Sequence, residues 1–162
     1  SKAYAMTGWR IGFIAAPQWI VKGCNKLQGQ YTSGPCSVSQ KAAEAAYTLP
    51  QDCVETMRQA FERRRDLIVS LAKEIPGLEV NKPEGAFYLF PKCSSFFGKT
   101  DGQRTINNST DFAMYLLEVG HVATVGGDAF GDPDCFRMSY ATSDDNIKEA
   151  MSRIKNALSL LK

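Results

Sequence analysis

The spacing of apolar residues changes near residue 76, where a helical pattern gives way to short strands and helices. Up to that point apolar residues recur mainly at helical intervals. They predict one helix after Pro17, a second from Ser37 to about Leu49, and a long third helix between Pro50 and Pro76–Gly77. The second helix opens with the spacing of a capping box.

Strands are predicted where β-branched and aromatic residues cluster between turn residues. One is expected at 8–16, and others at 78–80, 86–90, 122–125 and 135–140, with a helix at 111–119. A final helix begins with the box Thr142-x-x-Asp145. It carries a stripe expected to face the core: Ile147, Met151, Ile154, Leu158 and Leu161.

Composition is that of an ordinary globular protein with a sizeable core. The 162 residues are 44% hydrophobic and 22% charged, and 19 basic against 17 acidic residues leave a net charge of +2. This balance provides no field to attract nucleic acid or an anionic membrane. No apolar run is long enough to span a bilayer and no signal peptide is visible, so a cytoplasmic protein is expected.

The cysteine and histidine content excludes several kinds of site. The five cysteines form no Cys-x-x-Cys pair, which argues against a zinc site or a disulfide framework and favours reduced thiols packed as small apolar groups. His121 is the only histidine. A site with several histidine ligands is therefore impossible, no metal site is predicted, and acid–base chemistry falls to lysine, tyrosine or a carboxylate.

Three basic positions have alternative interpretations. Lys2 and Arg10 share a site only if the chain turns between them, for example at Met6–Gly8, and on pattern alone two exposed cations are favoured. Alternation places Arg137 on a face of its strand with the small residues Cys135 and Ser139, which leaves room beside it, but without further information a structural salt bridge is favoured. The Arg63–Arg65 run, flanked by acidic residues on a helix, is interpreted as a solvated face rather than a phosphate site.

A resemblance changes these interpretations. The segment Ser1–Gly12 (SKAYAMTGWRIG) is similar to the lysine segment of class I pyridoxal-phosphate aminotransferases, the aspartate aminotransferase family. Gly85–Tyr88 and Phe136–Ser143 continue the similarity in the family's order and spacing. One loop departs from it, because Gly126 stands where proline is usual, and a looser loop is expected there.

The resemblance implies roles for four residues. Lys2 would be catalytic, forming the Schiff base with pyridoxal 5'-phosphate and moving the substrate's α proton. Arg10 would bind the cofactor phosphate, and Ser1, which adjoins the lysine, is a weaker candidate for the same contact. Arg137 would pair with the α-carboxylate of the substrate. The implied reaction is transamination between an amino acid, aspartate or a related one, and a 2-oxo acid such as 2-oxoglutarate.

The resemblance also implies a fold and an assembly. We expect the C-terminal part of the α/β pyridoxal-phosphate transferase fold: the tail of the large α/β/α cofactor domain at 1–50, then a linker helix and small α+β domain at 51–162. The full-length enzyme would be a homodimer in which Tyr31–Pro35 approaches the partner's cofactor. Other essentials, including an aspartate for the pyridine nitrogen, would precede Ser1, so this piece alone is expected to be inactive.

Two alternatives stay open at this stage. Enzymes of the same fold catalyse β-elimination from cysteine-type substrates with the same lysine and carboxylate arginine, so these residues do not separate a lyase from a transaminase. The other alternative is a non-catalytic folding or dimerisation module.

Overall fold

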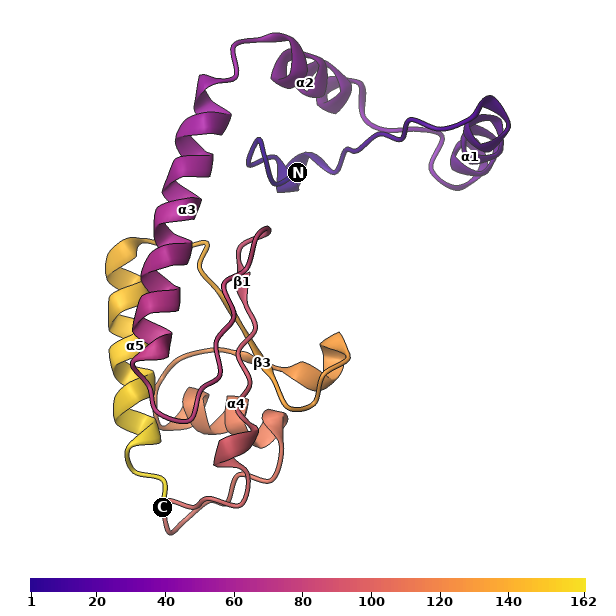
Figure 1. The fold of residues 1–162 in the computed structure, drawn as a ribbon. Helices are drawn as coiled ribbons and strands as arrows, with labels where there is room; N and C mark the ends of the chain where they lie inside the picture. Colours follow the sequence, from indigo (N-terminus) through magenta and orange to yellow (C-terminus); the bar gives the residue numbers. More distant parts are fainter. The chain divides into compact units, whose positions relative to one another are not determined.

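The computed structural model describes all residues 1–162, which form two compact units, Ser1–Arg58 and Gln59–Lys162. The division falls inside the long helix α3 (Asp52–Lys73), whereas the predicted domain boundary lies just before this helix. Each unit is described by itself below (Figure 1). None of the helices combines the length and the apolar composition that a membrane span requires.

The first unit is helical. A short 3-10 helix, η1 (Thr7–Trp9), precedes α1 (Gln18–Tyr31), α2 (Ser37–Thr48) and the start of α3. The three predicted helices are therefore confirmed. The capping box at the start of α2 is wrong, because Cys36 is the N-cap and no side chain caps the helix.

The strand predicted at 8–16 is wrong. Residues 7–9 form η1, and residues 10–17 adopt no regular structure. A strand needs a neighbour that satisfies its backbone donors and acceptors, and the only sheet of the structure consists of strands from the second unit. The β-branched and aromatic composition of the segment was therefore insufficient to make it a strand.

The second unit contains a three-stranded antiparallel sheet in the order β1–β3–β2. β1 is Tyr88–Leu89, β2 is Val125–Gly126 and β3 is Phe136–Ser139. In the register, Tyr88 lies opposite Ser139, and Val125 lies opposite Arg137. The segment predicted as a strand at 78–80 contributes only an isolated bridge, between Glu79 and Lys92.

Helices pack around this sheet. The unit contains two α-helices besides its part of α3, namely α4 (Ser109–Glu118) and α5 (Asp144–Leu158). It also contains two 3-10 helices, η2 (Ser94–Phe96) and η3 (Gly127–Phe130). All five residues of the predicted α5 stripe are buried, which confirms that this face meets the core. The N-cap of α5 is Ser143, whose hydroxyl accepts from the Asn146 N–H at 3.2 Å, and not the predicted Thr142.

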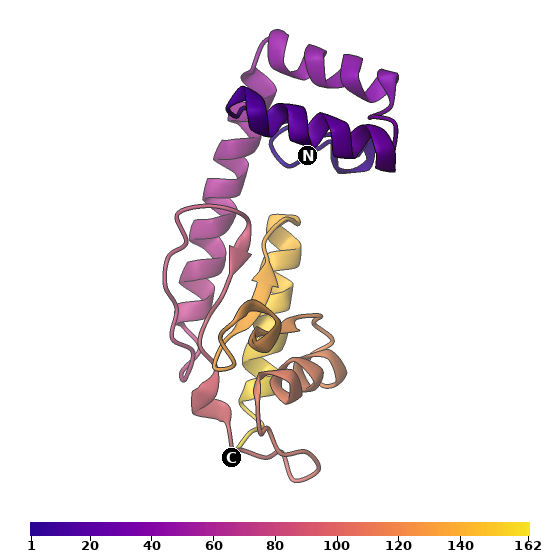
Figure 2. The same ribbon diagram turned by 90° about the vertical axis from the view of Figure 1, so that its right-hand side faces the viewer.

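Ion pairs join α5 to the part of α3 beside it, and the two helices run parallel (Figures 1 and 2). Arg63 and Arg64 both reach the Asp144 carboxylate, at 3.0 and 3.3 Å. Hydrogen bonding from Arg63 is the main cause of a lowered pKa at Asp144. Arg65 pairs with Asp66 at 2.9 Å. The arginine run is thus occupied by carboxylates, which argues against a phosphate site. The solvated face is right only for Arg63, because Arg64 and Arg65 are half-buried.

Candidate functional site

The N-terminal ten residues fold back on themselves twice. The Met6 N–H donates to the Ser1 carbonyl at 2.8 Å, and the Ala5 N–H donates to the Lys2 carbonyl at 3.1 Å. η1 follows at once and ends at Arg10, whose φ of 48° is left-handed. The turn required between Lys2 and Arg10 is therefore present.

The expected turn at Met6–Gly8 is present as the start of η1, where the Trp9 N–H donates to the Met6 carbonyl at 3.3 Å, but it does not use a left-handed glycine. The left-handed positions are Ala5, with φ 52°, and Arg10, while Gly8 has no positive φ. Gly8 and Gly12 instead leave open space, because a Cβ built on either would have no atom within 4 Å. A glycine at these positions keeps the main chain accessible to a ligand, which is the other use the sequence suggested.

The segment is attached to α2 by aromatic contacts within the first unit. The rings of Tyr4 and Phe13 both meet Tyr47 edge to face, at centroid distances of 5.4 and 5.3 Å. The Tyr4 hydroxyl also donates to the Gln51 side chain at 2.7 Å. These contacts hold both sides of the turn that carries Lys2 and Arg10.

Lys2 and Arg10 are exposed cations without carboxylate partners. Neither takes part in an ion pair, and the Arg10 guanidinium donates only to the Thr7 carbonyl, at 3.0 Å. The first acidic residue of the chain is Glu44. A primary amine and a guanidinium in an acid-free segment can receive an anionic ligand without first breaking an internal ion pair.

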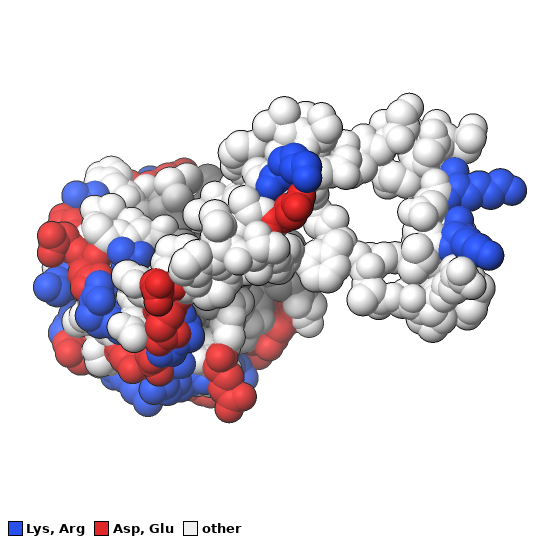
Figure 3. All heavy atoms as spheres, turned by 90° about the horizontal axis from the view of Figure 1, so that it is seen from above, with Lys and Arg blue, Asp and Glu red and all other residues white.

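Most of the exposed large hydrophobic side chains belong to the same unit. They include Trp9, Phe13, Trp19 and Tyr31, of which Tyr31 is 82% exposed. The part of the first unit at the right of Figure 3 correspondingly has few charged atoms. Exposed apolar surface of this kind is typical of protein or membrane interaction sites and of ligand-binding grooves.

Arg137 lies on the central strand of the second unit. Phe136, Met138 and Tyr140 are buried, whereas Arg137 is half-buried and Ser139 is exposed, as the alternation predicted. The salt bridge considered for Arg137 is absent, since no carboxylate pairs with it. Two aromatic rings take that place: the Arg137 Cζ lies 3.9 Å from the ring centroid of Phe130 and 4.4 Å from that of Tyr88.

The loop from β2 to β3 places Phe130, and its form differs from the looser one expected. Gly126 has φ −60° and ψ 149°, an extended conformation open to any residue. Gly127 is the position that requires glycine, because a Cβ there would lie 2.1 Å from the Asp132 carbonyl oxygen and 2.3 Å from that of Cys135. Its N–H donates to the buried Ser109 hydroxyl at 3.1 Å. The start of η3 is therefore tightly held.

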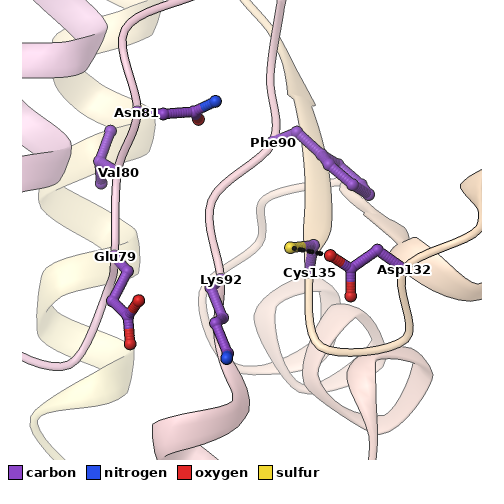
Figure 4. A pocket seen from close by; sticks show the side chains of 7 residues that line it. All are labelled: Glu79, Val80, Asn81, Phe90, Lys92, Asp132 and Cys135. Atoms are coloured by element: carbon purple, nitrogen blue, oxygen red, sulfur yellow. Dashed lines mark hydrogen bonds between the residues drawn. The ribbon is translucent and has the colours of Figure 1, made fainter.

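A shallow pocket of about 430 Å³ lies on the same unit (Figure 4). Its lining residues are Glu79, Val80, Asn81, Phe90, Lys92, Asp132 and Cys135. The Cys135 thiol donates to the Asp132 carboxylate at 3.3 Å, and burial raises its pKa to about 11. The Phe90 ring meets Phe130 edge to face at 6.2 Å, so one wall of the pocket adjoins the aromatic neighbours of Arg137.

The cysteines behave in two ways. Cys93 and Cys135 are buried, as expected for thiols that pack as apolar groups, and burial raises the pKa of Cys93 to about 12. Cys24, Cys36 and Cys53 are exposed, so that expectation is wrong for them. The pKa of Cys36, at the start of α2, is lowered mainly by the Ser39 backbone N–H.

The predicted site residues thus fall into two groups, each inside its own unit. Ser1, Lys2 and Arg10 share one folded segment, and Arg137 lies on β3. The contacts of the Phe130 and Tyr88 rings with Arg137 were not predicted from the sequence. The contact of Tyr88 could have been expected only from the register of the sheet, in which Tyr88 lies opposite Ser139.

Comparison with known proteins identifies the family. The model of the family described as aminotransferase class I and II matches residues 1–154. The chain therefore belongs to this family, which confirms the resemblance seen in its motifs.

Individual relatives are similar over the whole chain. A bifunctional aspartate aminotransferase and glutamate/aspartate-prephenate aminotransferase of Petunia hybrida is 49% identical over 100% of this chain and 35% of its own length. An aspartate aminotransferase of Rhizobium meliloti (strain 1021) is 49% identical over 97% of this chain and 38% of its own. The chain thus spans well under half the length of these relatives.

Solved structures confirm the fold class. The crystal structure of the Rhizobium meliloti aspartate aminotransferase superposes with a TM-score of 0.95 at 48% identity, over 99% of this chain and 40% of that one. An aromatic aminotransferase from Pyrococcus horikoshii OT3 gives 0.86 at 38% identity, over 98% and 41%. The chain has the α/β fold of the corresponding part of these aminotransferases.

Proposed function

We propose that this chain is the C-terminal part of an aminotransferase that transfers the amino group of aspartate or a related amino acid to a 2-oxo acid such as 2-oxoglutarate. The observation that carries the proposal is the set of cations without carboxylate partners, Lys2, Arg10 and Arg137, in a chain of this family. Each is free to pair with an anionic or carbonyl-bearing ligand.

The proposed cofactor is pyridoxal 5'-phosphate, and the first unit fits it. An aldehyde requires a primary amine, which Lys2 offers, and a phosphate suits the permanently charged, planar guanidinium of Arg10. Ser1 adjoins Lys2 and adds a hydroxyl donor to the same exposed segment. When bound, the cofactor supplies an electron sink for the bonds at the substrate's α carbon.

The chain's own residues then have separate tasks. Arg137 binds the α-carboxylate through two parallel N–H donors, which orients the Cα–H bond. The Lys2 amine would take the proton from the substrate's α carbon as a general base and donate it to the bound cofactor as a general acid. Arg10 holds the phosphate, and thereby the cofactor, in one orientation.

We further propose that the rest of a longer protein completes the site. The chain spans 35% to 41% of the length of the relatives and structures compared with it, and its first unit exposes much apolar surface. Missing partners would include an acid for the pyridine nitrogen, and a second subunit approached by Tyr31–Pro35 in a homodimer. A cytoplasmic location stays a prediction.

The test uses the full-length protein that contains this chain. We expect it to form oxaloacetate from aspartate with 2-oxoglutarate, and Lys2→Ala to lose this activity by a factor of about 10⁴. Arg137→Lys, which keeps the charge but loses the bidentate geometry, should lower kcat/KM about 100-fold. Full activity of either variant would contradict the proposal.

Two further measurements separate the alternatives. Pyruvate and ammonia from cystathionine, without oxo-acid-dependent transfer, would show a β-eliminating lyase instead. The 162-residue chain with added pyridoxal phosphate should not transaminate, and native rates from it would show that the remainder is dispensable. A folding or dimerisation module without catalytic function predicts that Lys2→Ala changes nothing in the full-length protein.

A further inference from the structure

Arg137 is held by aromatic rings on both sides of its strand. Tyr88 belongs to β1 and Phe130 follows β2, and these two strands flank β3 on opposite sides. The guanidinium carbon lies 4.4 Å from one ring centroid and 3.9 Å from the other. Both distances are well inside the 6 Å range of a cation–π contact.

An arginine held by aromatic rings differs from one in a salt bridge in its uncompensated charge and in its free N–H donors. The π-faces of the rings attract the cation, but neither ring supplies a carboxylate oxygen to its N–H donors. A carboxylate partner would occupy those donors and neutralise the charge. Rings therefore restrict the position of Arg137 and leave its N–H edge free for an incoming carboxylate.

The two rings are themselves supported. Phe130 meets Phe90 edge to face, with an interplanar angle of 88°, and Tyr88 packs on Phe87 at a centroid distance of 4.6 Å. Phe130 is 43% exposed, so part of its ring lies outside the core while it contacts the Arg137 guanidinium.

We infer that Phe130 and Tyr88 are positioning residues that hold the Arg137 guanidinium ready for the substrate's α-carboxylate. This inference rests on the proposed function and adds residues to it. A pre-positioned guanidinium loses less rotamer freedom when substrate binds, so the rings raise affinity for every substrate with an α-carboxylate. The carboxylate is bound before and during the reaction, so the effect falls on KM more than on kcat.

The test compares ring-removing and ring-keeping variants in the full-length holoenzyme. Phe130→Leu should raise KM for aspartate and for 2-oxoglutarate by about tenfold each, with kcat changed less than about threefold. Phe130→Tyr keeps a ring and should restore KM to within about threefold of the unmodified enzyme. Tyr88→Leu should act in the same direction as Phe130→Leu.

A matched control removes a cation–π contact elsewhere in the same unit. The Lys99 Nζ lies 5.2 Å from the Phe96 ring centroid, and Lys99→Met should leave both KM values unchanged. Thermal unfolding of each variant shows whether any effect is due to lost folding.

The outcomes separate this inference from the proposed function. If Arg137→Lys raises KM but Phe130→Leu does not, the positioning role is wrong and the aminotransferase proposal stands. If Arg137→Lys also leaves KM and kcat unchanged, the carboxylate role of Arg137 fails, and the proposed function fails with it. A fall in kcat alone for Phe130→Leu, or no rescue by Phe130→Tyr, would also overturn the positioning role.

Discussion

Gly127 is the position where a single added methyl group should be most disruptive. Alanine would place its Cβ 2.1 Å from the Asp132 carbonyl oxygen and 2.3 Å from that of Cys135. A carbon and a carbonyl oxygen ordinarily approach no closer than about 3.3 Å. Gly127→Ala therefore requires both main-chain carbonyls to move by about 1 Å, and these belong to the connection that leads into β3.

The expected loss in the free energy of unfolding is large because the obstructing atoms belong to the backbone. Overpacking costs about 1 to 3 kcal/mol where side chains can adjust, and we expect about 3 kcal/mol here. For a unit of about 100 residues, this lowers the Tm by about 10 to 25 °C. The displacement also reaches Phe130, so in the full-length enzyme KM should rise in the same direction as in Phe130→Leu.

The assay must report on the second unit. Both tryptophans, Trp9 and Trp19, lie in the first unit, so tryptophan fluorescence would follow the wrong part of the chain. Hydrogen exchange in urea, read by mass spectrometry on peptides from residues 59–162, follows the second unit alone.

Gly85→Ala provides the control for this assay. A Cβ at Gly85 has no atom within 4 Å, and the residue has no positive φ. Its substitution should change stability by less than about 0.5 kcal/mol. If Gly127→Ala is as stable as Gly85→Ala, the close approach inferred around Gly127 is incorrect.

Three other predictions concern stability and reactivity. The arginines of α3 lower the pKa of Asp144. The ionised carboxylate therefore stabilises the folded chain fully above its unfolded pKa, and this stabilisation is lost as the pH falls through the lower folded pKa. The Tm difference between the unmodified chain and Asp144→Asn should be constant near neutrality and vanish in acid. Thiol titration with mass mapping should find Cys36 modified first, and Cys93 and Cys135 only on unfolding; rapid native labelling of either would refute their burial. Tyr115→Phe removes a buried 2.8 Å hydrogen bond to a main-chain carbonyl and should cost about 1 to 2 kcal/mol in urea unfolding, whereas no loss would show that water replaces it.

Local patterns predicted the helices well and their ends less well. The apolar repeats of α3 and α5 are several turns long, so both helices were predicted, and the predicted stripe of α5 is buried. Caps depend on one or two residues, and neighbouring Thr142 and Ser143 are both suitable types. In the structure Ser143 caps α5, whereas Cys36 is the N-cap residue of α2 and no side chain caps that helix.

Strands were predicted less securely because each depends on a partner. The alternation of β3 was correct, since its neighbours lie on both sides within the chain. Residues 8–16 have suitable strand composition but no neighbour, and they form no strand. Pairing is a non-local property, so composition alone does not determine it.

The sequence by itself determined the family, the helices and the basic residues of the candidate site, because motifs, apolar periodicity and charge are all local properties. Only the tertiary structure decided what surrounds those residues. Phe130 and Tyr88 meet Arg137 because β3 lies between β1 and β2, and Gly127 is required because two carbonyls from the following loop converge on it. Both arrangements depend on how distant segments pack, and no short stretch of sequence contains that information.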